Sequence, residues 1–220
     1  MNKRYQVFVS STYEDLREER SKVMTALLEL NCIPAGMELF PAADDDAWTL
    51  IRDVIDECDY YVLILAGRYG SCDKDGISYT EKEYRYALEK GKKIIAFIHA
   101  SPGTLAQNKC EQEADGRAKL DSFRGLAKAK VCKFWSSADE LASVVSRGLV
   151  QLINRYPGVG WVRADQLPAD DILSETIRLQ KHVRELEAQL KEYEEGPPPN
   201  TAHLANQPLA PMLSGIQALA

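Results

Sequence analysis

Small hydroxyl side chains, an arginine and two acidic side chains gather at a few points of the chain where a ligand could be held. They form three groups: Ser10-Ser11-Thr12, Gly67-Arg68-Tyr69-Gly70 and Ser78-Tyr79-Thr80-Glu81-Lys82-Glu83. Hydroxyls and a guanidinium suit phosphate and sugar oxygens, because a guanidinium can pair with phosphate through two parallel hydrogen bonds. A carboxylate such as Glu81 or Glu83 can stabilise developing positive charge.

Other catalytic signatures are absent from the sequence. It has no Walker motif, no GxGxxG and no GxSxG elbow, and His99 is the only histidine in its central part. The five cysteines are widely spaced and form no CxxC pair, so we expect neither a disulfide framework nor a zinc site. No metal ligand set is visible, and we expect no resident cofactor.

Composition excludes further classes of function. Lys and Arg number 27 against 33 Asp and Glu, a net charge of −6, which argues against nonspecific nucleic-acid binding. No run of about 18 apolar residues could cross a membrane. The basic start Met1–Gln6 is followed by no signal-peptide core. The sequence therefore predicts a cytoplasmic protein that binds neither membranes nor nucleic acid.

Strands and helices that alternate along the chain must position the three groups. Apolar and β-branched runs predict strands at 5–10, 32–40, 60–66, 93–98 and 131–135. Helical spacing predicts helices at 47–58, 80–89 and 119–129. A capping box of Ser11 with Glu14 opens a further helix whose apolar face runs to Leu27, and one of Ser137 with Glu140 opens a helix to 155. The alternation predicts an α/β domain with a parallel five-stranded sheet, helices on both faces and the flavodoxin-like order 2-1-3-4-5. Pro34 lacks an amide donor and favours a place at the sheet edge.

The carboxyl ends of such strands form the ligand crevice, so the three groups are expected to meet there with Phe40-Pro41-Ala42. A structural alternative remains for the glutamates. Ser78 with Glu81 and Thr80 with Glu83 both fit capping boxes, of which only one register can be the cap. Arg68 could equally form a surface ion pair, and Tyr69 could simply pack.

The C-terminal part has a different pattern. From Asp171 to Glu195 a heptad seam runs through Ile172, Thr176, Leu179, Val183, Leu186, Leu190 and Tyr193. It predicts a coiled-coil helix for self-association, although the helix could also fold back onto its own domain. Residues 196–220 carry no charged side chain and five of the ten prolines, which is typical of a flexible tail. We expect a domain at 1–163, a linker and oligomerisation helix at 164–195, and the tail.

Several segments together resemble a TIR-like domain family of uncharacterised function. They are Val7–Tyr13, Gly36–Pro41, Asp59–Leu65, Gly67–Gly70, Ser78–Tyr84, Phe134–Ala142 and Tyr156–Trp161. The resemblance covers roughly residues 5–163. It implies a flavodoxin-like (TIR-like) fold and membership of the TIR and nucleoside-deoxyribosyltransferase-like superfamily. Many bacterial members of that superfamily cleave the nicotinamide–ribose bond of NAD in antiphage immunity, and TIR enzymes commonly need assembly.

The resemblance also implies site residues. TIR enzymes carry a Trp-Cys-x-x-Glu stretch whose Glu is catalytic; here Tyr79 and Thr80 stand in the Trp and Cys places, and Glu83 in the catalytic place. Glu81 is a rival carboxylate. The nucleotide-binding residues would be Ser10, Ser11, Thr12, Arg68, Tyr69 and Tyr79. The expected function is NAD cleavage with NAD as substrate; the alternative is a non-catalytic scaffold that senses a nucleotide and recruits partners.

Overall fold

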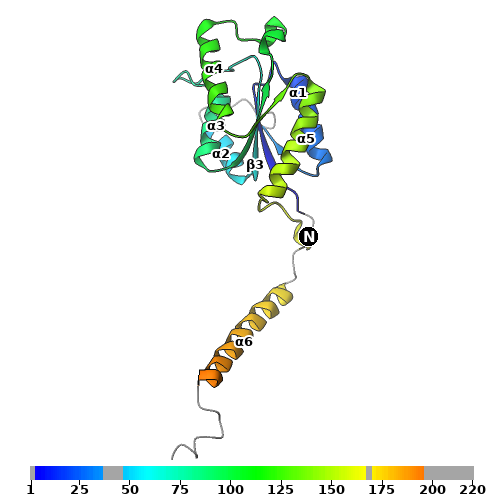
Figure 1. The fold of residues 1–220 in the computed structure, drawn as a ribbon, viewed down its shortest axis with the longest axis vertical. Coiled ribbons are helices and arrows are strands. Elements are labelled where there is room, and N and C mark those ends of the chain that lie inside the picture. The colour runs from blue at the N-terminus through cyan, green and yellow to red at the C-terminus, as the bar shows by residue number, and fades with distance from the viewer. Residues whose placement is uncertain (1–2, 37–46, 167–169, 196–220) are drawn as a thin grey trace, which may run out of the picture. The chain divides into compact units, whose positions relative to one another are not determined.

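The structure of the chain is a computed structural model that describes residues 3–36, 47–166 and 170–195. The chain divides between Arg163 and Ala164 into two compact units. Among the described residues, the first unit contains the sheet and five α-helices, and the second contains a short 3-10 helix and one long α-helix (Figure 1). The predicted contributions of residues 37–46, including Phe40-Pro41-Ala42, and of the tail at 196–220 lie outside the described residues.

A five-stranded parallel sheet forms the centre of the first unit. Its strands are β1 (Gln6–Ser10), β2 (Ile33–Ala35), β3 (Tyr60–Leu65), β4 (Lys93–His99) and β5 (Cys132–Trp135). Their order is β2-β1-β3-β4-β5, and every pair is parallel. The predicted fold class and strand order are therefore confirmed. The strand that contains Pro34 lies at an edge, as its missing amide donor favours.

Helices cover both faces of this sheet. They are α1 (Arg17–Glu29), α2 (Ala47–Glu57), α3 (Tyr79–Glu89), α4 (Ala114–Lys128) and α5 (Ala138–Arg155). α1 and α5 lie on one face, and α2, α3 and α4 lie on the other (Figure 1). Short 3-10 helices, η2 (Pro102–Thr104) and η3 (Gln107–Lys109), lie in the connection from β4 to α4, and η4 (Ala164–Gln166) follows the first unit.

Side-chain alternation along the strands divides the core into two layers. Phe8 of β1 and Tyr61 of β3 face α3, where their rings stack at 5.5 Å. Val7 and Val9 face the opposite layer, towards α1 and α5. All six residues of β3 are buried, as expected for a strand covered on both faces. The central strands thus hold their carboxyl ends at fixed positions.

The predicted start of the first helix is wrong. α1 begins at Arg17 after Leu16, with no side-chain cap, rather than at a capping box of Ser11 and Glu14. The Ser11 hydroxyl has other partners: it donates to the Thr12 carbonyl at 2.7 Å and accepts from Arg20 at 2.7 Å. The segment between β1 and α1 is therefore a loop that can border a cavity.

The capping box predicted at the start of α5 holds in part. Ser137 is the N-cap and accepts a hydrogen bond from the amide of Glu140 at 3.3 Å. The Glu140 carboxylate accepts from Ser136 rather than from Ser137. The helix predicted from residue 119 begins earlier, at Ala114, because Gly116 lies within its first turn and does not interrupt it.

The second unit is the helix α6 (Asp170–Glu195), which includes the whole predicted seam. Seven apolar side chains on it are at least half exposed or close to it: Ile172, Leu173, Ile177, Leu179, Val183, Leu186 and Leu190. Self-association through this helix stays a prediction. Across the described parts of the chain, no helix combines the length and the apolar character needed to span a membrane.

Candidate functional site

A cavity of about 400 Å³ opens at the carboxyl ends of β1 and β3, beside the start of α3. We call it the hydroxyl lobe. It is lined by Ser11, Thr12, Tyr13, Glu14, Asp15, Arg68, Gly70, Ser71, Tyr79, Thr80 and Glu111. Four of the predicted nucleotide-binding residues, Ser11, Thr12, Arg68 and Tyr79, are therefore brought together. This is the crevice position expected for a ligand in a parallel sheet.

A second cavity of about 810 Å³ adjoins the first, because Glu14, Asp15 and Arg68 line both. We call it the amide lobe. Its remaining lining comes from the connection between β4 and α4: Gln107, Asn108, Lys109, Cys110 and Gln112. The two lobes form a cleft whose shared residues are all charged, while the rest of each lobe is mainly uncharged apart from Lys109 in the amide lobe and Glu111 in the hydroxyl lobe.

Glu83 does not line the hydroxyl lobe, although Ser11 and Thr80 near it do. Its carboxylate accepts a hydrogen bond of 2.5 Å from the Ser10 hydroxyl at the end of β1, and only 1% of the residue is exposed. Thr80, three residues earlier on α3, does line the lobe. The Tyr61 hydroxyl is also near: burial and the neighbouring Glu83 charge raise the pKa of Tyr61 well above its ordinary value.

Glu81 has a different set of partners. Its carboxylate accepts from the Tyr69 hydroxyl at 2.7 Å and pairs with Arg85 at 2.6 Å. Its amide donates to Ser78, the N-cap of α3, at 3.2 Å. The cap thus uses the register of Ser78, and the competing register of Thr80 and Glu83 is not used. Capping accounts for Glu81 and leaves Glu83 without a capping role.

The two candidate side chains of the Gly67–Gly70 segment, Arg68 and Tyr69, lie in different surroundings. Tyr69 is buried in the core layer next to α3 and lines neither lobe. Arg68 lines both lobes and is 3.8 Å from Glu14, an exposed carboxylate. An exposed pair at that distance contributes little to stability, so Arg68 remains available to an anionic ligand.

Sequence reasoning missed several buried polar residues around the site. Arg20 of α1 is buried and donates to the Val9 carbonyl as well as to Ser11, which fixes the end of β1. Arg124 of α4 donates to the Ala66 carbonyl at 3.1 Å and to the His99 carbonyl at 2.8 Å, tying the ends of β3 and β4 together. The sequence offered one signal for these residues: an arginine stands at a helix position where the helical spacing calls for an apolar side chain.

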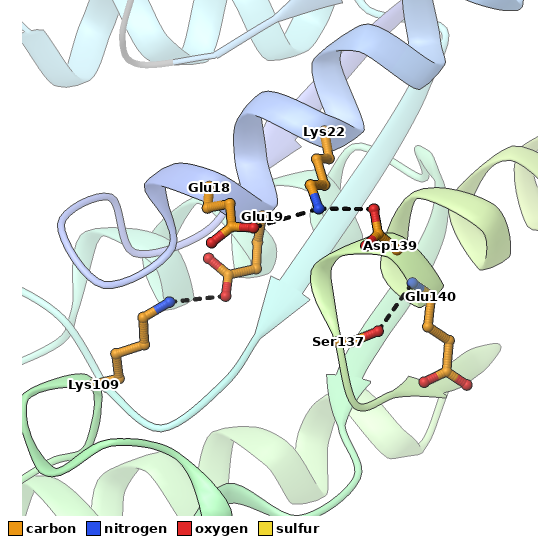
Figure 2. Close-up of polar contacts among 7 residues, drawn as sticks. All are labelled: Glu18, Glu19, Lys22, Lys109, Ser137, Asp139 and Glu140. Atoms are coloured by element: carbon orange, nitrogen blue, oxygen red, sulfur yellow. Dashed lines mark hydrogen bonds and ion pairs between the residues drawn. The ribbon is translucent and has the colours of Figure 1, made fainter.

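Ion pairs join α1 to the η3 segment and to α5, as Figure 2 shows. Lys109 in η3 pairs with the buried Glu19 of α1 at 2.9 Å. On the same helix Lys22 pairs with Asp139 of α5 at 2.7 Å and with Glu18 at 3.4 Å. Lys109 is thereby anchored where it can face the cavity.

Gly67 allows the connection from β4 to α4 to lie against the end of β3. The Glu111 amide donates to the Gly67 carbonyl at 2.7 Å, and a Cβ at Gly67 would lie 2.4 Å from the Lys109 carbonyl oxygen. We therefore expect Gly67→Ala to lower the free energy of unfolding by about 1–3 kcal/mol, because backbone must shift. Urea denaturation measures this change.

Gly125→Ala is the matched control for that prediction. Gly125 lies in α4, and a Cβ there would meet no atom within 4 Å. Alanine is favoured over glycine inside a helix by about 1 kcal/mol, so this variant should be as stable as the wild type or more so. Equal stability of the two alanine variants would contradict the proposed close approach at Gly67.

Comparisons with known proteins place the chain in a family. A domain of unknown function, DUF4062, matches residues 6–150, which is more than half of the 220 residues. The chain is an α/β protein of flavodoxin-like strand order and belongs to the DUF4062 family. This agrees with the expected family of uncharacterised function, and the TIR-like character of the chain stays a prediction. No curated protein matches the chain.

Solved structures with a similar fold include three of different kinds. A CMP N-glycosidase of Clostridium botulinum, BcmB, is 17% identical with a TM-score of 0.41, covering 65% of this chain and 98% of that one. The TIR domains of the activated Roq1 resistosome are 12% identical with a TM-score of 0.46, and the match covers 66% of this chain and 99% of that one. A short-chain flavodoxin associated with a bacterial microcompartment is 14% identical with a TM-score of 0.35, and the match covers 68% of this chain and 98% of that one.

The described residues offer no cluster of three or more His, Cys, Asp or Glu side chains that could hold a metal ion. The side chains that line the cleft include the hydroxyls of Ser11 and Thr12, the guanidinium of Arg68, the ammonium of Lys109, and the carboxylates of Glu14, Asp15 and Glu111.

Proposed function

We propose that this protein binds a nucleotide in the hydroxyl lobe and hydrolyses its N-glycosidic bond, with NAD as the first substrate to test. The observation that carries the proposal is the hydrogen bond between Ser10 and Glu83 at the carboxyl end of β1. It holds a carboxylate next to Ser11, which lines a cavity together with Thr12, Arg68 and the exposed ring of Tyr79. The sequence resemblance to TIR-like domains points to the same residue.

The proposed reaction needs one fixed anion. When the bond between ribose C1′ and the nicotinamide nitrogen breaks, the electron pair leaves with nicotinamide and C1′ becomes an oxocarbenium-like cation. The Glu83 carboxylate stabilises that cation. Water then adds to C1′ and releases a proton, giving ADP-ribose, nicotinamide and H⁺.

One contact of Glu83 would stabilise a negative charge, because the Ser10 hydroxyl donates to its carboxylate. Glu83 follows the first turn of α3, which holds Glu81, so the helix dipole adds little. Burial opposes the charge. Because Glu83 is buried, neighbouring side chains must move before a substrate reaches it. Catalysis therefore requires a rearrangement when the ligand binds.

That same burial favours a second candidate function. A carboxylate that is 1% exposed and hydrogen-bonded to Ser10 could simply join α3 to β1. The cleft would then bind a nucleotide without cleaving it, and the protein would act as a sensing or signalling scaffold. The hydroxyl lobe serves either function, so the two differ only in turnover.

Free nicotinamide released from NAD distinguishes the two functions. Purified protein is incubated with NAD, and nicotinamide is quantified by chromatography at several protein concentrations. Release of many nicotinamide molecules per protein molecule supports the enzymatic function. NAD binding without release at any concentration or assembly state would contradict cleavage and support the scaffold.

We further infer that α6 pairs with a second copy of the chain. Along its seam Leu179 and Leu186 occupy d positions and Val183 an a position, a combination that favours parallel two-stranded coiled coils. These three side chains are about half exposed within the chain itself. A dimer would raise the local concentration of the N-terminal units and could support the defence role that the resemblance implies.

Leu186→Asp in the full chain is expected to convert a dimer to a monomer. The change buries a charge in the seam, which is costly without a partner. Ala188→Asp adds the same charge to an exposed position outside the seam and should leave the mass unchanged. Light scattering measures both, and a chain ending at Arg163 adds a third comparison. A dimer that survives Leu186→Asp would remove the seam from the proposal.

A further inference from the structure

Asp15 is a buried carboxylate at the junction of the two lobes. It precedes α1, lines both the hydroxyl lobe and the amide lobe, and is only 5% exposed. Its Oδ2 atom has no hydrogen-bond partner among the described residues. Buried polar atoms in folded proteins are nearly always hydrogen-bonded, so this buried oxygen is an unused acceptor on a residue that lines both lobes.

The charges around Asp15 indicate the kind of group that it accepts. Burial raises the pKa of Asp15, while hydrogen bonding by the Thr12 side chain and the Asp15 backbone lowers it, as do the smaller effects of the Arg68 and Lys109 charges. Those cations disfavour a metal ion or an ammonium group at the same place. A neutral donor, such as a hydroxyl, satisfies Oδ2 without adding positive charge.

Arg68 and Lys109 suit an anionic group, such as a phosphate, on the ligand whose hydroxyl donates to Asp15. Arg68 lines both lobes, and Lys109, anchored by Glu19, lines the amide lobe. A phosphate between them would lie next to Asp15. A ligand with a phosphate and a neighbouring hydroxyl therefore matches the junction better than a purely anionic or purely cationic one.

We propose that Asp15 is a specificity-determining residue that accepts a hydrogen bond from a ribose hydroxyl of a nucleotide whose phosphate lies on Arg68 and Lys109. This inference rests on the proposed nucleotide site and adds to it a selection for ribonucleotides over deoxyribonucleotides. A deoxy analogue would leave the Asp15 oxygen buried and without a partner, which is how hydrogen-bonding sites reject substrates that lack a hydroxyl.

The test compares affinities rather than turnover. Calorimetry measures the binding of AMP and CMP, each with its 2′-deoxy and 3′-deoxy analogues, to wild type and to Asp15→Asn. Wild type should prefer the ribonucleotide by about tenfold over one of the analogues, and Asp15→Asn should lose this preference. Glu18→Gln, which removes an exposed charge of α1 outside both lobes, should keep it.

Thermal unfolding checks that Asp15→Asn is folded. The pKa of Asp15 is raised above 3.8, so its ionisation opposes folding, and this loss of stability grows as the pH rises through the raised pKa. Asp15→Asn removes that charge and should melt no lower than wild type at pH 7. The analogues test the wild type independently of any variant.

The outcomes separate this inference from the proposed function. Equal affinity of wild type for ribonucleotides and both analogues, or a preference that survives Asp15→Asn, overturns the role of Asp15 and leaves NAD cleavage to its own assay. Absence of any nucleotide binding to wild type overturns both proposals. Loss of the preference in Asp15→Asn alone, with Glu18→Gln like wild type, supports the assignment.

Discussion

Glutamine in place of Glu83 is expected to lower NAD cleavage by about 10²–10³-fold, the loss seen when a group that stabilises transition-state charge is removed. Glutamine keeps the size of the side chain and can still accept from Ser10, but it has no charge to stabilise the cation at C1′. Because the chemical step is affected, kcat should fall while KM changes little. Initial rates of nicotinamide release measure both.

Glu81→Gln is the matched control, two residues away on the same helix. Its carboxylate joins Tyr69 and Arg85, so its neutralisation should lower stability and leave turnover within severalfold of wild type. If Glu81→Gln abolishes turnover while Glu83→Gln does not, the catalytic carboxylate is Glu81. If both variants retain full turnover, neither glutamate is the catalytic group.

Replacement of Arg124 by methionine is expected to lower the free energy of unfolding by about 3 kcal/mol. The buried guanidinium donates to the carbonyls of Ala66 and His99, which methionine would leave buried without those donors. For a unit of this size the melting temperature should fall by roughly 6–12 °C. Calorimetry measures the shift.

Lys128→Met tests whether any lost cation on α4 has the same effect. Lys128 is exposed in the last turn of that helix, and its removal should change stability by less than about 0.5 kcal/mol. Similar melting temperatures for Arg124→Met and wild type would show that the carbonyls at the ends of β3 and β4 find other donors. That result would contradict a structural role for Arg124 beneath the cleft.

Local patterns determined most of the fold in advance. The apolar run at β3 and the β-branched residues of β1 and β4 predict strands because burial on both faces leaves little choice of side chain. Helical spacing and Ser137 predict α5 for an equally local reason. The predicted start of α1 was wrong because the Ser11 hydroxyl accepts from Arg20, nine residues later, and does not cap the helix.

The amino-acid sequence thus determined by itself the alternation of strands and helices, since this alternation follows from hydrophobic patterning over short windows. The parallel sheet and its strand order came from the few arrangements that such an alternation favours. Only the tertiary structure decided the roles of individual polar side chains. Glu83 meets Ser10 across 73 residues, and Glu81 meets Tyr69 instead. Asp15 became a buried acceptor through its position between two cavities. Such contacts depend on how distant segments pack, and no local pattern encodes them.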